Sequence, residues 1–195
     1  MRTDEFAKVL MSQERRRWQN PEKVIRSLGV TKGMSVADLG CGPGFFTIPL
    51  ALAVGGSGAV YAVDSDARML YHLRVNLEKL GSTPHGSVKR IEADLTETKI
   101  PSGSIDVALF ANVLHDLAEP RAFLNEVRRI IKKDSVIVDV DWKKMDTGIG
   151  PPPGLRLSAE ESEEILRKAG FRLAKPIYAG RLHYGLLCKP IWRQD

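Results

Sequence analysis

The sequence predicts a single α/β domain built on a mostly parallel sheet, and three observations lead to that prediction. Short apolar stretches alternate with helical segments between residues 35 and 140. A glycine-rich turn follows directly after the first of these stretches. The chain has 195 residues, which suits one domain (residues 1–195) with a sizeable core. Because parallel strands are joined by crossover connections that are usually helices, the alternation favours a parallel sheet.

Residues 1–30 are expected to form a helical cap before the sheet. The pattern over residues 3–18 predicts one amphipathic helix. Its apolar side is predicted to hold Phe6, Val9, Leu10 and Trp18. A second helix is expected from Pro21 to about residue 28, because Asn20 is a favoured N-cap and proline is favoured in the first turn.

The elements of the sheet follow in strict order. Strands are predicted at residues 35–39, 59–63, 87–92, 105–110 and 135–140, and helices near residues 45–54, 67–80 and 121–131. Residues 141–157 are rich in glycine and proline, which predicts a loop that could close as a lid over a site. Ser158 and Glu161 form a capping box for a helix to about residue 169, which Gly170 ends. Two last strands, near residues 171–178 and 183–189, predict a terminal antiparallel hairpin.

The most informative segment is the turn after the first strand, VADLGCGPGFFT at residues 36–47. Gly40, Gly42 and Gly44 allow a ligand to approach the backbone, at the carboxyl end of a strand where open α/β sheets bind ligands. A dinucleotide fingerprint has the spacing GxGxxG, whereas this loop has GxGxG preceded by Asp38. A carboxylate there would repel a pyrophosphate and suits a cationic amino group. The spacing therefore argues against NAD.

Two further acids follow later strands. Asp64 ends the second strand, about twenty residues after the glycine loop, which is the usual interval for an acid that binds a ribose. Asp94 follows the third strand, where a carboxylate can accept a hydrogen bond from an adenine amino group. The three strand ends together predict a nucleoside-containing ligand with a cationic group.

At this point the chain resembles the class I S-adenosylmethionine-dependent methyltransferases. The matching motifs are DLGCGPG at 38–44, VYAVDSD at 60–66, EADLTE at 92–97 and IDVALFANVLHDL at 105–117. The resemblance runs from about residue 18 to the end and includes AGF at 169–171. It implies a Rossmann-like fold with a seven-stranded, mostly parallel sheet, helices on both faces and a C-terminal antiparallel hairpin. S-adenosylmethionine is the cofactor that it implies.

The resemblance also assigns residues to parts of the cofactor. The methionine part would be surrounded by Asp38, Gly40, Cys41, Gly42 and Gly44, with Cys41 as a packing residue rather than a nucleophile. Asp64, with Ser65 beside it, would hold the ribose, and the adenine would lie against Ala93, Asp94 and Leu95. Asn112 and Val113 would lie beside the sulfonium.

His115 is the candidate general base, because it follows the fourth strand on the side that faces the methyl donor in this fold. Its ordinary pKa of roughly 6.5 suits proton removal near neutral pH. The alternative is a structural histidine that bonds a loop carbonyl. Candidate walls of the acceptor pocket are Arg15, Trp18, Gln19, Asp141 and Trp142.

The leading hypothesis is methyl transfer to a small molecule, at an oxygen, nitrogen, sulfur or activated carbon atom. Two alternatives stay open, a protein lysine methyltransferase and a cofactor-binding interaction protein without turnover. Residues 111–114 read ANVL and lack the Asn/Asp-Pro-Pro-aromatic motif typical of enzymes that methylate base amino groups. With only Cys41 and Cys188, arsenite and RNA carbon-5 methylation are also disfavoured.

Composition limits the partners. The net charge is +5, but the basic residues occur in small groups beside acids, so solvated helix faces are favoured over a nucleic-acid surface. The cysteines and histidines lack zinc-ligand spacing, so no structural metal is expected. No apolar run is long enough to span a bilayer, and no signal-peptide pattern is present, which favours a cytoplasmic protein without membrane contact. Either a monomer or a homodimer is compatible with the sequence.

Overall fold

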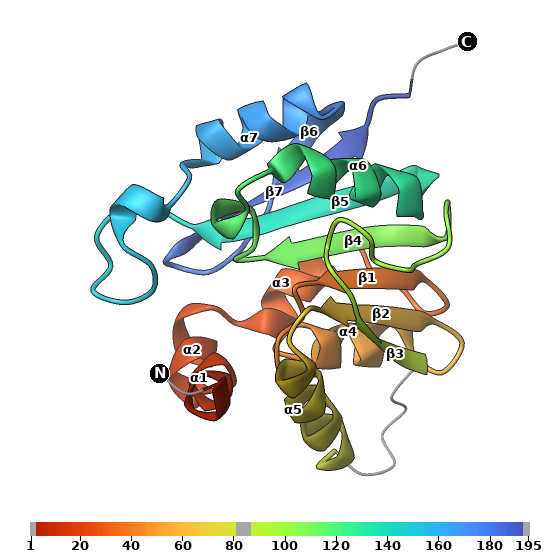
Figure 1. Ribbon diagram of the computed structural model, residues 1–195, viewed down its shortest axis with the longest axis vertical. Coiled ribbons are helices and arrows are strands. Elements are labelled where there is room, and N and C mark those ends of the chain that lie inside the picture. Colours follow the sequence, from red (N-terminus) through yellow and green to blue (C-terminus); the bar gives the residue numbers. More distant parts are fainter. Residues whose placement is uncertain (1–2, 81–86, 193–195) are drawn as a thin grey trace.

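The computed structural model describes residues 3–80 and 87–192, and its centre is a seven-stranded sheet with helices on both faces (Figure 1). The strands are β1 (Ser35–Leu39), β2 (Ala59–Asp64), β3 (Ser87–Glu92), β4 (Ile105–Ala111), β5 (Ile131–Trp142), β6 (Phe171–Pro176) and β7 (His183–Pro190). Their order is β3-β2-β1-β4-β5-β7-β6. Strands β1 to β5 are parallel, whereas β7 runs antiparallel to both β5 and β6. The predicted fold class is confirmed.

The central strands are apolar because helices cover both faces of the sheet. Four of the five residues in β1 and four of the six in β2 are buried. One core cluster lies around Phe110, Phe123 and Phe171, and a second lies around Leu50 and Val107. Strands that are buried on both faces read as continuous apolar runs, which is why the alternation of strands and helices was visible in the sequence.

The helices that pack beside the sheet lie close to their predicted positions, and two of them begin at predicted caps. These helices are α3 (Pro21–Ser27), α4 (Thr47–Val54), α5 (Ala67–Glu78), α6 (Pro120–Ile130) and α7 (Ala159–Lys168), with short 3₁₀ turns η1 (Leu114–Asp116) and η2 (Pro153–Leu155). The Asn20 side chain accepts a hydrogen bond from the backbone N–H of Lys23 at 2.8 Å. Ser158 and Glu161 form both bonds of the predicted capping box.

The predicted continuous helix over residues 3–18 is wrong. The structure has two helices there, α1 (Thr3–Leu10) and α2 (Gln13–Trp18). Ser12 adopts an extended conformation, and its Oγ accepts a hydrogen bond from the N–H of Arg15 at 3.2 Å, so it caps a new helix. On the predicted apolar side, Phe6 and Val9 are 41% and 54% exposed.

The fifth strand is longer than predicted, and this corrects the start of the expected lid loop. Asp141 and Trp142 belong to β5, where they pair with Tyr184 and His183 of β7. The antiparallel partner extends the strand beyond the apolar run that marks it in the sequence. The loop therefore begins at Lys143. In the described part of the chain, no helix has the length and apolar character needed to cross a bilayer.

Candidate functional site

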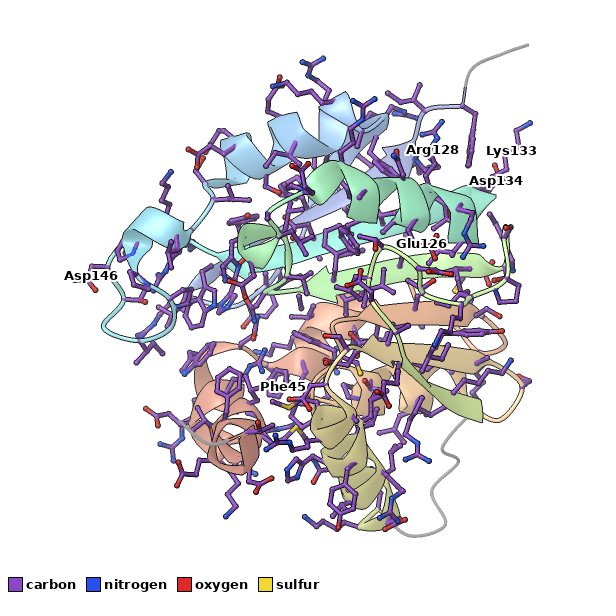
Figure 2. The ribbon with its side chains drawn as sticks, in the orientation of Figure 1. Phe45, Glu126, Arg128, Lys133, Asp134 and Asp146 are labelled. Carbon is purple, nitrogen blue, oxygen red and sulfur yellow. The ribbon has the colours of Figure 1, made fainter. Side chains whose placement is uncertain are left out.

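A cavity of about 970 Å³ opens at the carboxyl ends of β1, β2 and β4, beneath α1 and α2. The cavity runs along neighbouring strands in the order β2-β1-β4-β5, and we divide its lining into two parts. The part that we call the glycine-loop end is lined by Asp38, Gly40, Gly42, Asp64, Met69 and Leu95. The part that we call the tryptophan end is lined by Trp18, Asn112, His115, Trp142, Ile149 and Pro151. Figure 2 shows Phe45, another lining residue, beside the α1–α2 region.

Backbone groups shape the glycine-loop end. The N–H groups of Gly40 and Cys41 both donate to the Val63 carbonyl, at 2.9 and 3.0 Å. Gly40 has a φ of +75°, and a Cβ atom there would lie 2.6 Å from Val113 Cγ2. At Gly42 a Cβ would meet nothing closer than 3.8 Å. Gly40 is therefore required by packing, whereas Gly42 borders open space in the cavity.

Gly44 does not line the cavity. A Cβ atom at this position would lie 2.5 Å from Leu73 Cδ1, and its φ is +98°. The third glycine of the loop thus lets α5 pack against the loop, and its contacts are structural.

Asp38 and Arg15 are two buried charged groups at the base of the cavity. Thr47 Oγ1 donates to Asp38 Oδ2 at 2.5 Å, and burial raises the pKa of Asp38 to about 7. The Arg15 guanidinium donates twice to Gln19 Oε1, at 3.0 and 3.1 Å, and lies 3.9 Å from the centre of the Phe45 ring. Burial lowers the pKa of Arg15 to about 10, so it stays charged at neutral pH.

The predicted ribose acid lies at the cavity, and the predicted adenine acid does not. Asp64 accepts hydrogen bonds from the N–H groups of Gly42 at 2.8 Å and Asp66 at 2.9 Å, and burial raises its pKa. Asp94 is exposed, and its Oδ1 accepts hydrogen bonds from the N–H and the Oγ1 hydroxyl of Thr96, at 2.8 and 2.6 Å. These bonds lower the pKa of Asp94. Ser65, Ala93 and Asp94 are outside the lining, whereas Leu95 belongs to it.

Asn112 has an unusual backbone at the end of β4. Its φ is +59°, a left-handed conformation that is uncommon for residues other than glycine. Its N–H donates to the Val140 carbonyl at 2.8 Å, and its buried Oδ1 has no hydrogen-bond partner. A strained residue with an unsatisfied acceptor in a cavity is typical of a ligand contact.

His115 and Asp141 form a buried pair at the tryptophan end. His115 Nδ1 lies 2.7 Å from Asp141 Oδ1 and 2.9 Å from Oδ2, and the two side chains are only 4% and 1% exposed. His115 Nε2 lies 3.2 Å from Asp116 Oδ1. Burial acts to lower the pKa of His115, but the hydrogen bond and charge of Asp141, with the charges of Asp116 and Asp139, raise it overall.

Aromatic rings form the adjoining wall. The Trp18 indole is stacked with the His183 imidazole at 5.4 Å between centroids and 3° between planes, and Trp142 lies 5.3 Å from Trp18. Both nitrogens of His183 are buried without hydrogen-bond partners, and burial lowers its pKa to about 3, so the ring is neutral. The turn between β6 and β7 holds Trp18 in place, because the Arg181 N–H donates to the Trp18 carbonyl at 3.0 Å.

The segment from Lys143 to Leu157 is wrapped around the buried side chain of Arg156. This guanidinium donates to the carbonyls of Lys143, Met145, Ile149 and Pro151 and to Thr147 Oγ1, at 2.7–3.1 Å. It also lies 4.9 Å from the centre of the Trp142 ring. The predicted lid is thus a loop closed on itself, with Ile149, Gly150 and Pro151 facing the cavity.

The sequence prediction and the cavity overlap in most positions. Of the predicted residues, those that line it are Asp38, Gly40, Cys41, Gly42, Asp64, Leu95, Asn112, Val113 and His115, with Arg15, Trp18 and Trp142 from the candidate walls. Reasoning from sequence missed Met69 and Asp66 at the start of α5, the Thr47 contact to Asp38, and His183. Thr47 carries a signal that could have been used, because it starts the helix just after the glycine loop.

The residues that the structure describes contain no group of three or more His, Cys, Asp and Glu side chains arranged to hold a metal. His85 lies outside the described residues. Cys41 and Cys188 are buried free thiols, and burial raises the pKa of both. Cys41 is therefore protonated at neutral pH, as expected of a packing residue.

Comparison with known proteins places this geometry in a family. A family profile described as a methyltransferase domain matches residues 37–138. The chain is 31% identical to an S-adenosylmethionine-dependent methyltransferase from Aquifex aeolicus, with a TM-score of 0.87 over 96% of this chain and 98% of that one. It is also 29% identical over 135 residues to demethylmenaquinone methyltransferase from Staphylococcus aureus, a match that covers 69% of this chain and 53% of that protein.

A Streptomyces fradiae protein of uncharacterized function, encoded in a transposon, is 33% identical over 124 residues, which is 63% of this chain and 34% of that protein. The chain thus spans about half or less of the length of these curated relatives. The Aquifex aeolicus protein, in contrast, matches over nearly its whole length and shares the fold. With the family profile covering more than half of its residues, the chain belongs to the S-adenosylmethionine-dependent methyltransferases.

Proposed function

We propose that this protein transfers the methyl group of S-adenosylmethionine to a small-molecule acceptor. One observation carries the proposal: a single cavity joins the buried charges of the glycine-loop end to the His115–Asp141 pair at the tryptophan end. S-adenosylmethionine, when bound, supplies a methyl group on a positively charged sulfur, which a nucleophile can displace. The chain's own groups must bind this donor, align the acceptor and exclude water.

The glycine-loop end fits the cofactor. Asp38 would pair with the amino group of the methionine part, and the charged Arg15 would face its carboxylate. Each oxygen of Asp64 already accepts one backbone N–H and retains a lone pair for a ribose hydroxyl. The unpartnered Oδ1 of Asn112 would accept a hydrogen bond from the bound molecule.

His115 is placed to remove a proton from the acceptor. Asp141 holds Nδ1, so Nε2, which lies 3.2 Å from the exposed carboxylate of Asp116, is the nitrogen that can take up the proton. The negative charges of Asp141 and Asp116 stabilise the imidazolium that forms. The competing role of a structural histidine bonded to a loop carbonyl finds no support in these contacts, because the partner of Nδ1 is a carboxylate.

Two features support a small acceptor. The helices α1 and α2 and the loop of residues 143–157 all contribute to the cavity lining, so the site is walled by three chain segments in addition to the strand ends. Three basic residues at the far end of the sheet are already engaged: Arg128 donates to the Gly170 carbonyl, Arg129 pairs with Glu126, and Lys132 pairs with Asp106. Figure 2 shows Glu126 and Arg128 at this end, with Asp146 at the opposite end.

The test uses S-adenosylmethionine with a labelled methyl group, purified protein and a fractionated cell extract. Label in the small-metabolite fraction, reduced with the Asp38→Asn variant at a limiting cofactor concentration, is the expected result. Label in protein or nucleic acid would overturn the small-molecule assignment. Calorimetry with the cofactor alone measures binding separately, so cofactor binding without label in any fraction would favour a binding protein without turnover.

A further inference from the structure

The walls of the tryptophan end carry information about the acceptor that goes beyond its size. Trp18 is half-buried and lines the cavity, and its indole is backed by His183 and Trp142. His183 is neutral, so this aromatic group presents no charge to a ligand. Aromatic rings prefer offset-stacked or edge-to-face contact with other rings, which gives such a wall a preference for flat, unsaturated ligands.

The wall is also fixed in shape. Gly150 lies flat against Trp142, since a Cβ atom there would come within 2.7 Å of the indole. Arg156 holds the loop that carries Gly150 through the carbonyl bonds already described, and Gly180 lets the β6–β7 turn pack directly on the Trp18 backbone. Three chain segments therefore hold the two indoles, and the space beside them is preformed rather than adaptable.

The polar groups at the tryptophan end are few, and they suit an acceptor whose reacting group carries a proton. His115 Nε2 can accept a proton, and Asp141 behind it favours the protonated ring. Asn112 and Asp116 are the other polar residues of the lining near His115, whereas Ile149, Pro151 and Leu117 are apolar. A ligand that enters here must be mostly apolar and must direct one proton-bearing group toward His115.

Resting on the methyl transfer proposed above, we propose that the acceptor is a planar aromatic molecule whose ring hydroxyl is methylated, with the ring against Trp18 and the hydroxyl toward Nε2 of His115. The hydroxyl proton passes to Nε2 and then to water. The hydroxyl oxygen forms the new bond to the methyl carbon, and the electron pair of the broken carbon–sulfur bond stays on sulfur. An aromatic hydroxyl loses its proton far more readily than an aliphatic one, which matches a histidine base.

The experiment compares two probes of similar size, 2-naphthol and its saturated counterpart decahydro-2-naphthol. Calorimetry measures their binding to the full chain saturated with S-adenosylhomocysteine, a demethylated cofactor that permits no turnover. We expect 2-naphthol to bind about tenfold more tightly, since ring contacts and the hydrogen bond to His115 both favour it. With labelled S-adenosylmethionine, the labelled product is the methyl ether of 2-naphthol.

Three variants test the wall. Trp18→Leu keeps an apolar side chain and is expected to reduce the preference for 2-naphthol about fivefold, whereas Trp18→Phe restores most of it. Trp192→Leu is the matched control, because Trp192 packs on Arg128 at the far end of the sheet and is expected to change neither affinity. Circular dichroism establishes that each variant is folded.

Equal affinity for the two probes, or an equal loss with Trp192→Leu, would overturn the aromatic assignment. If neither probe binds while S-adenosylhomocysteine does and another compound in the extract is labelled, the acceptor class is wrong and methyl transfer stands. If S-adenosylhomocysteine itself fails to bind, the proposed function fails and this inference fails with it.

Discussion

The two ends of the cavity are built in different ways. At the glycine-loop end, most of the bonds that shape the loop are donated by backbone N–H groups, from Gly40 and Cys41 to the Val63 carbonyl and from Gly42 to the Asp64 carboxylate. At the tryptophan end, side chains hold one another: His115 with Asp141, Trp18 with His183, and Arg156 around its loop. Most substitutions leave the backbone geometry unchanged, whereas each substitution in a wall of side chains changes the shape and polarity of that wall. The first construction suits a ligand that never changes, and the second suits an acceptor that sets specificity.

The largest expected effect separates chemistry from cofactor binding. His115→Ala is predicted to lower kcat about a hundredfold or more, since removal of a general base costs that much. Its affinity for S-adenosylmethionine, measured by calorimetry, is expected to stay within about twofold because the residue lies at the tryptophan end. His72→Gln is the control, since His72 pairs with Asp4 outside the cavity lining. An unchanged kcat in His115→Ala would remove His115 from proton transfer.

The next effect lies at the glycine-loop end. Asp38→Asn removes a buried charge while keeping the bond to Thr47 possible, and it is predicted to weaken cofactor binding about tenfold to a hundredfold. In the wild type, the pKa of Asp38 is raised to about 7, so its carboxyl is protonated below that pH. Cofactor affinity should therefore fall as the pH drops through 7, and the Asn variant should lose this dependence.

Calorimetry between pH 6 and 8 checks both statements about Asp38. Asp134→Asn is the control, because Asp134 is exposed at the far end of the sheet (Figure 2). A variant that binds the cofactor as tightly as the wild type would show that Asp38 is a packing group.

A smaller effect on kcat is expected from Asp141, the hydrogen-bond partner of His115. Asp141→Asn leaves His115 in place but removes the charge that stabilises its protonated form, so we predict a loss of about tenfold in kcat. In the wild type, Asp141, Asp116 and Asp139 raise the pKa of His115 against the effect of burial, so kcat should rise with pH through a value above 6.5. In Asp141→Asn this transition should move to lower pH. A pH profile of kcat that stays in place would assign Asp141 a structural role only.

The smallest effect tests a region outside both ends. Glu126 accepts the N–H and Oγ1 of Thr98 at 2.8 and 2.6 Å and pairs with Arg129 at 2.7 Å. Glu126→Gln is predicted to lower the free energy of unfolding by about 1 kcal/mol at pH 7, measured with urea, while cofactor affinity stays unchanged.

The Arg129 bond lowers the pKa of Glu126 to about 2. The stabilisation is thus full above about pH 4.5 and should disappear as the pH falls toward 2. A changed cofactor affinity in Glu126→Gln would show that the far end of the sheet is coupled to the cavity.

The sequence alone determined the order of the elements and the location of the candidate cofactor site. Strands buried on both faces are apolar throughout, so β1, β2 and β4 were found within one residue of their bounds. The caps at Asn20 and Ser158 are local bonds between residues three apart, and such bonds are readable from sequence. The glycine loop and Asp64 follow strand ends directly, so the sheet brings them together whatever the rest of the chain does.

Tertiary structure decided the remainder. Whether residues 3–18 form one helix or two depends on Ser12. The free energy of a helix break with the Ser12 capping bond differs little from that of a continuous helix, so tertiary packing decides between the two. The extension of β5 to Trp142 requires β7 as a partner, and β7 lies forty residues later in the chain. The wall of Trp18, Trp142 and His183 combines three distant segments, and the pairing of His115 with Asp141 joins the turn after β4 to β5. Contacts of this kind have no local spacing in the sequence, because the sheet order and the docking of α2 on the β6–β7 turn bring these side chains within reach of one another.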